Sequence, residues 1–117
     1  MQQTPILSLT LTAATAITAA RFIDFDGNHA ANGELPLGVS AYGAAVGVDL
    51  SVRVLGTAML EAGGPIARGG PIKPAADGSG KGIAQAGAGP IGAYALEAAL
   101  AAGELIEVLI VRTPAPA

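Results

Sequence analysis

One glycine-rich segment has the spacing of a dinucleotide-binding turn. Residues 87–92, Gly-Ala-Gly-Pro-Ile-Gly, match G-x-G-x-x-G, in which the glycines let a pyrophosphate approach the backbone where a helix begins. Ala95 to Ala102 has helical composition over about two turns, and the aliphatic run Leu105 to Val111 follows as a strand. This order predicts a small Rossmann-like nucleotide-binding fragment as one candidate function.

The residues around the turn weigh against that function. The preceding segment, Lys81 to Ala86, lacks the continuous aliphatic run of a central parallel strand. Where an acidic residue would bind the ribose, about 20 residues after the turn, the chain carries Val111 and Arg112. Glycines needed for turns and close packing explain the spacing equally well. We therefore expect no nucleotide and no other cofactor.

The chain has few residues suited to metal binding or catalysis. The chain has no Cys and a single His, His29, so thiolate chemistry and paired-imidazole metal sites are excluded. Asp24, Asp26 and Asn28 alternate around Gly27 like a calcium loop, but the later glutamate is missing, and a hairpin turn is expected instead. The glutamates are dispersed, and no serine lies in G-x-S-x-G. We predict neither a metal site nor an enzyme.

The composition of the chain excludes some classes of binding partner. Charged residues make up 13% of 117 residues, the net charge is −3, and the six Lys and Arg form no stripe. Nucleic-acid binding therefore lacks its electrostatic basis. No stretch is long and apolar enough for a membrane span. The uncharged segment from Ile6 to Ala20 has no basic residue before it, which disfavours a signal peptide; a secreted β-domain stays open as a further alternative.

The elements that must position any site are strands. After Pro5, Leu7, Leu9 and Leu11 alternate with Ser and Thr, the pattern of a half-buried strand. We treat residues 1–12 as an extended N-terminal arm that pairs either with another subunit or within its own sheet. Residues 13–112 are expected to form one β domain, and residues 113–117 a flexible Pro/Ala tail.

The domain divides into two loosely similar halves, 13–62 and 63–112, which suggests duplication. Strands are expected from Ile17 to Phe25 and from Leu50 to Leu55 in the first half. Short strands separated by Gly and Pro turns favour an all-β fold, a small Gly/Ala-rich barrel or a jelly-roll-like sandwich with at most one short helix. The matched positions are Ile17 with Ile66, Ile23 with Ile72, Gly38 with Gly92, Gly47 with Gly103, Val52 with Val108, and Val54 with Ile110.

The C-terminal half carries a family resemblance. The sequences Ile91-Gly-Ala-Tyr-Ala-Leu-Glu-Ala-Ala99 and Ala102-Gly-Glu-Leu-Ile-Glu-Val-Leu-Ile110 resemble small capsid-cement, or head decoration, proteins of tailed bacteriophages. The segment from Ile66 to Ile72, with Asp77 and Gly78 after it, is similar to an upstream motif of the same family, and Ile17 to Gly27 looks like a second, divergent copy.

The resemblance implies a non-enzymatic structural protein. Such a protein binds the outer surface of the capsid lattice and stabilises contacts between major capsid subunits. It implies a homo-oligomer, with a trimer preferred over a dimer, made in the host bacterial cytoplasm and then carried on the virion. The expected contact residues, for the capsid or for a neighbouring subunit, are Leu7, Leu9 and Leu11.

Overall fold

The chain folds entirely into β-strands and loops. The computed structural model describes residues 5–31, 34–85 and 89–113, and within these ranges no helix occurs. The strands are β1 (Pro5–Thr12), β2 (Phe22–Ile23), β3 (Gly38–Ser40), β4 (Asp49–Glu61), β5 (Pro71–Pro74), β6 (Gly82–Ala84), β7 (Ile91–Ala95) and β8 (Leu105–Thr113). The expectation of an all-β, barrel-like fold is confirmed.

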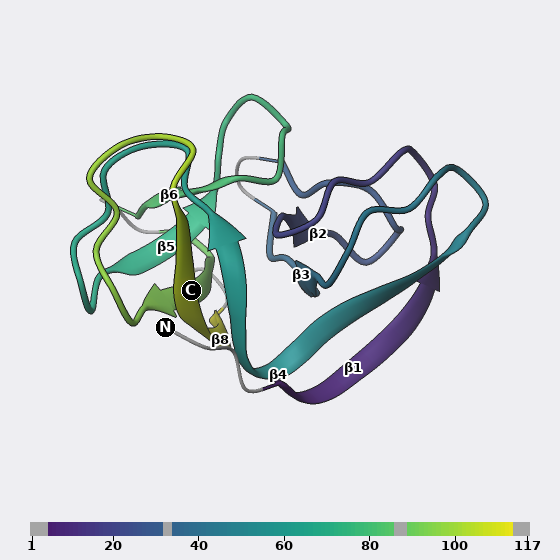
Figure 1. The fold of residues 1–117 in the computed structure, drawn as a ribbon, viewed down its shortest axis with the longest axis horizontal. Coiled ribbons are helices and arrows are strands. Elements are labelled where there is room, and N and C mark those ends of the chain that lie inside the picture. Colours follow the sequence, from purple (N-terminus) through teal and green to yellow (C-terminus); the bar gives the residue numbers. More distant parts are fainter. Residues whose placement is uncertain (1–4, 32–33, 86–88, 114–117) are drawn as a thin grey trace.

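One curving sheet contains all eight strands, in the order β2-β3-β4-β8-β7-β5-β6, with β1 beside β4. β4 is the longest strand and bends sharply at the lower side of the molecule (Figure 1). Gly56, within β4, adopts a φ of 93°. On one edge β4 pairs first with β1, up to Gly56, and then with β8, from Thr57 onward. A single strand thus serves both halves of the chain.

The two halves repeat the same backbone hydrogen bonds. In each half an isoleucine exchanges two bonds with an alanine, and a glycine with positive φ donates to the carbonyl of another alanine. The bonded pairs are Ile17 with Ala44, Ile66 with Ala99, Gly47 with Ala13, and Gly103 with Ala62. This pattern agrees with the sequence similarity between 13–62 and 63–112, for which duplication remains our interpretation.

The pairing of β4 extends the correspondence to β1. In the first half Leu11 lies opposite Leu50, and in the second half Leu60 lies opposite Ile106. β1 therefore occupies, beside the first part of β4, the position that residues 57–61 occupy beside β8. Within this chain β1 is a strand of the sheet, at its edge.

Buried side chains form two clusters. The larger is built around Phe22, Leu60, Ile72 and Ile106, which are all 2% exposed or less. The smaller contains Ile17, Ile23, Leu50, Val52, Val54 and Ala13, and Leu11 of β1 packs against it. Phe22 comes from the first half but packs in the larger cluster with residues of the second, so the halves share a core.

A polar cluster also joins the halves. The Arg21 guanidinium donates to Glu61 Oε1 from Nε at 3.2 Å and from Nη2 at 3.1 Å, and to the Ser79 carbonyl from Nη1 at 2.8 Å. Lys81 Nζ lies 3.4 Å from the other carboxylate oxygen of Glu61. The guanidinium thus ties the segment before β2 to the end of β4 and to the loop before β6.

The helix expected from Ala95 to Ala102 is wrong. β7 ends at Ala95, and Ala99 is held by Ile66 in an isolated bridge. The Glu104 carboxylate accepts hydrogen bonds from the amides of Leu100 and Ala101, at 3.0 and 2.8 Å, which fixes a turn instead. Tertiary hydrogen bonds here override the helical preference of alanine. Among the described residues no helix could cross a membrane.

Candidate contact surface

The glycine-rich segment is not built as a nucleotide site. Gly87 lies outside the described residues, but Gly92 is buried in β7, where a Cβ would meet Pro36 Cγ at 2.6 Å and Phe22 Cε1 at 2.8 Å. Between residues 93 and 113 no helix follows it to receive a pyrophosphate. Gly92 is therefore a packing glycine that lets the core aromatic Phe22 approach β7.

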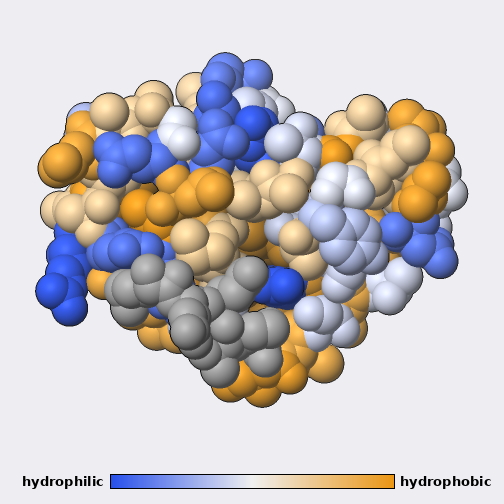
Figure 2. All heavy atoms as spheres, viewed as in Figure 1, coloured by the Kyte–Doolittle hydropathy of each residue, from blue (hydrophilic) through white to orange (hydrophobic). Residues whose placement is uncertain are grey.

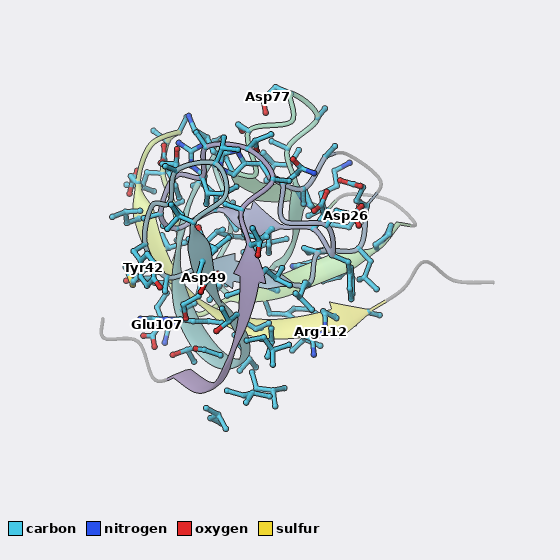
Figure 3. All side chains as sticks on the ribbon, turned by 90° about the vertical axis from the view of Figure 1, so that its right-hand side faces the viewer. Asp26, Tyr42, Asp49, Asp77, Glu107 and Arg112 are labelled. Carbon is cyan, nitrogen blue, oxygen red and sulfur yellow. The ribbon has the colours of Figure 1, made fainter. Side chains whose placement is uncertain are left out.

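The acidic residues serve as turn acceptors. The Asp24 carboxylate accepts hydrogen bonds from the amides of Asp26 and Asn28, both at 2.9 Å, and closes the turn around Gly27. Asp77 likewise accepts from the Ser79 amide at 3.0 Å. Hydrogen bonding with the Ser79 side chain, and after it with the Ser79 amide, lowers the pKa of Asp77. Figure 3 shows Asp26, Asp77 and Glu107 on different sides of the molecule. Within the described ranges no three potential ligands converge on a metal.

His29 is a structural acceptor. Its Nε2 accepts a hydrogen bond from the Thr18 amide at 3.1 Å, which requires the ring to be unprotonated at that nitrogen. Burial lowers the pKa of His29, the positive charge of Arg21 lowers it further, and Asp24 partly opposes them. This hydrogen bond therefore holds the loop before β2 in place.

The structure places the three leucines expected at the contact surface in one edge strand, β1. Leu9 and Leu11 lie opposite Val52 and Leu50, two residues of the smaller core cluster. Between Ser8 and Leu7 the register shifts by one residue of β4, so that Leu7 lies opposite Leu55. That the three leucines form one contact face stays a prediction.

Leu7 lies opposite another exposed leucine of the sheet. Its partner Leu55 is 43% exposed, and Leu109 of β8, which lies opposite the neighbouring Thr57, is 40% exposed. Leu7 itself is 45% exposed. The hydrophobic lower margin in Figure 2 lies over the start of β1 and the bend of β4. Leu55 and Leu109 were not expected as contact residues, since only the register brings Leu55 beside Leu7.

Leu9 remains 43% exposed although it lies opposite the buried Val52, because β1 is an edge strand. The surface of β1 thus combines exposed leucines, hydroxyl side chains and an unpaired strand edge. It can bind a polypeptide through apolar contact and backbone hydrogen bonds. It carries no group suited to catalysis.

Comparison with known proteins now identifies the family. The family model for phage cement proteins matches residues 1–110. The chain belongs to the phage cement protein family. The resemblance expected from the C-terminal motifs is thereby confirmed, and it extends across β1 as well. No curated protein sequence matches the chain.

A solved structure supports the fold of this cement protein. The N base of the head fiber gp8.5 of bacteriophage phi29 superimposes with a TM-score of 0.74 at 21% sequence identity. The match covers 95% of this chain and 98% of that one. At this identity the likeness concerns the fold, and with the family match it supports a capsid-associated structural role.

Proposed function

We propose that this cement protein decorates the outer surface of a phage head and stabilises contacts between major capsid subunits. The observation that carries the proposal is the family match over residues 1–110. The surface of β1 supports it physically, because exposed leucines at a strand edge suit attachment to another protein. The protein acts without cofactor, metal or catalysis. It is made in the host cytoplasm before it joins the virion.

The protein acts as a homo-oligomer, with a trimer preferred over a dimer. A small domain with a thin core gains stability by burying surface against copies of itself. Because several linked subunits bind together, a weak contact per subunit gives a high overall affinity for the head. Sedimentation at micromolar concentration tests this part: monomers only, free and on heads alike, would contradict it.

Attachment is tested with expanded heads that lack the protein. The unaltered chain should saturate such heads and raise their resistance to heat or chelators. Leu9→Asp should reduce occupancy by about tenfold or more, because a carboxylate would enter a contact that buries the remaining exposed part of Leu9. Thr10→Ser, on the opposite face, is the matched control and should bind normally.

The control outcomes separate folding from attachment. Circular dichroism of Leu9→Asp should match the unaltered chain, since nearly half of Leu9 is already exposed. Heads that never retain the unaltered protein would refute the proposed function. Normal occupancy by Leu9→Asp would instead remove Leu9 from the contact.

A further inference from the structure

The edge of β1 presents backbone groups away from the molecule. The Ala13 amide donates to the Val48 carbonyl at 3.0 Å, and the register of β1 with β4 continues from this pair without a shift up to Ser8. In an antiparallel ladder hydrogen-bonded and non-bonded pairs alternate. Leu9 and Leu11 therefore bond to β4. The amides and carbonyls that point away belong to Ser8, Thr10 and Thr12.

In the second half of the chain, the strand edge that corresponds to the outer edge of β1 is covered by a backbone segment. Glu61, which lies opposite Leu105, occupies the position of Thr12, which lies opposite Asp49. The Glu61 amide donates to the Ala20 carbonyl at 2.8 Å, so a segment of the first half covers that edge. Among the described residues no backbone group beyond the sheet bonds to the Thr12 amide. The turn around Gly27 lies against the Thr12 carbonyl, but among the described residues no backbone group bonds to the outward amides of β1.

The charges at the edge beside Glu61 and at the outer edge of β1 indicate what kind of segment could pair with β1. At the closed edge Glu61 pairs with Arg21 and Lys81. At the open edge Thr12 replaces the glutamate, and residues 5–12 carry no charge. The occupant therefore needs no cation. It needs an extended backbone, small or hydroxyl side chains beside Ser8, Thr10 and Thr12, and apolar side chains beside Leu9 and Leu11.

A second copy of this chain does not offer the equivalent segment. The segment that covers Glu61 contains Ala20, with a φ of 60°, and its counterpart in the second half begins at Gly69, with a φ of 79°. The Phe22 amide donates to the Gly80 carbonyl at 2.6 Å, but the corresponding residue is Pro71, which has no N–H. Gly70 likewise stands where the first half has Arg21. The second-half segment of another copy would therefore lack both the amide bond of Phe22 and the guanidinium contacts of Arg21.

We propose that the outer edge of β1 receives an extended, uncharged segment of the major capsid protein, which joins the sheet as an added strand. The proposal rests on the proposed function and assigns its contact to the backbone of Ser8 and Thr10 and to the Thr12 amide. The leucines beside them add apolar contact. Specificity comes from the alternation of hydroxyl and apolar side chains on the two faces.

Backbone hydrogen exchange on the full chain, free and bound to expanded heads, is the first test. The outward amides of Ser8, Thr10 and Thr12 should exchange rapidly in the free protein and at least tenfold more slowly on heads. The inward amides of Leu9 and Leu11 are bonded to β4 in both states and serve as the internal reference. Binding without added protection of the outward amides would overturn the strand proposal and leave the proposed function standing.

A backbone variant gives the second test. Thr10→Pro removes one outward N–H and leaves the bonds to β4 in place, a position that edge strands tolerate. It should bind heads about tenfold more weakly than Thr10→Val, which keeps the N–H and loses only the hydroxyl. Equal binding of the two variants would refute the proposal. If Thr10→Pro does not fold, exchange on the unaltered chain still decides.

The remaining outcomes are also decisive. Protection of the outward amides in the free oligomer, before heads are added, would show that a second copy occupies the edge and would overturn the capsid segment. Failure of the unaltered chain to bind heads would overturn the proposed function and this contact together.

Discussion

Replacing Gly92 by alanine tests the shared core. The added Cβ would lie 2.6 Å from Pro36 Cγ and 2.8 Å from Phe22 Cε1, whereas carbon atoms pack at about 3.5–4.0 Å. Phe22 is fully buried and cannot move toward solvent. Overpacking of this kind costs about 1–3 kcal/mol. At about 4 °C per kcal/mol for a domain of this size, the melting temperature should fall by about 4–12 °C.

Calorimetry or urea unfolding of Gly92→Ala measures the effect, with Gly64→Ala as the control. Nothing lies within 4 Å of a Cβ at Gly64, so this variant should stay within about 0.5 kcal/mol of the unaltered chain. Adding Phe22→Leu to Gly92→Ala should cost less than the two changes summed, because the shorter side chain relieves the clash. Equal melting temperatures for Gly92→Ala and Gly64→Ala would refute the packing argument.

Three further predictions follow. The free energy of unfolding should fall as the pH drops below about 6.5, because the unfolded His29 then binds a proton that burial and Arg21 disfavour in the folded state. Urea titrations between pH 7.5 and 5 measure this fall, which should be smaller for His29→Gln. Glu61→Gln should lower the free energy of unfolding by about 1–2 kcal/mol, because it weakens charged hydrogen bonds from Arg21; a stability unchanged in urea would contradict this. Calorimetry should detect no NAD(P) binding, and tight binding abolished by Gly89→Val would restore the nucleotide hypothesis.

Much of the fold could be predicted because its long strands alternate clearly. The segment from Leu50 to Leu55 lies within β4, and the run from Leu105 to Val111 lies within β8. The strand expected from Ile17 to Phe25 shrinks to β2, because Ile17 makes only an isolated bridge and the turn set by Asp24 ends the pairing. Alternation predicts which face is buried but not how far a ladder extends.

The contact surface was harder to predict, because it depends on register. The leucine pattern correctly indicated a strand, but the bulge that places Leu7 opposite Leu55 has no signal in composition. The tail was placed one residue too early, since Thr113 still pairs with Ile91; residues 114–117 lie outside the described residues. The Ala-rich stretch predicted a helix because no local pattern reveals the bridge to Ile66.

The sharing of β4 explains why an open edge exists at all. When two similar units are joined by one continuous strand, the first part of that strand ends one unit and the second part begins the next. The beginning of the second unit is then covered by the first, as the bond from Glu61 to Ala20 shows. At the beginning of the first unit, β1, no described backbone group bonds to the outward amides. An uncharged strand of eight residues with part of its edge open would favour aggregation unless a partner pairs with it. The arrangement of the two units thus supplies the physical reason to look for the capsid contact on β1.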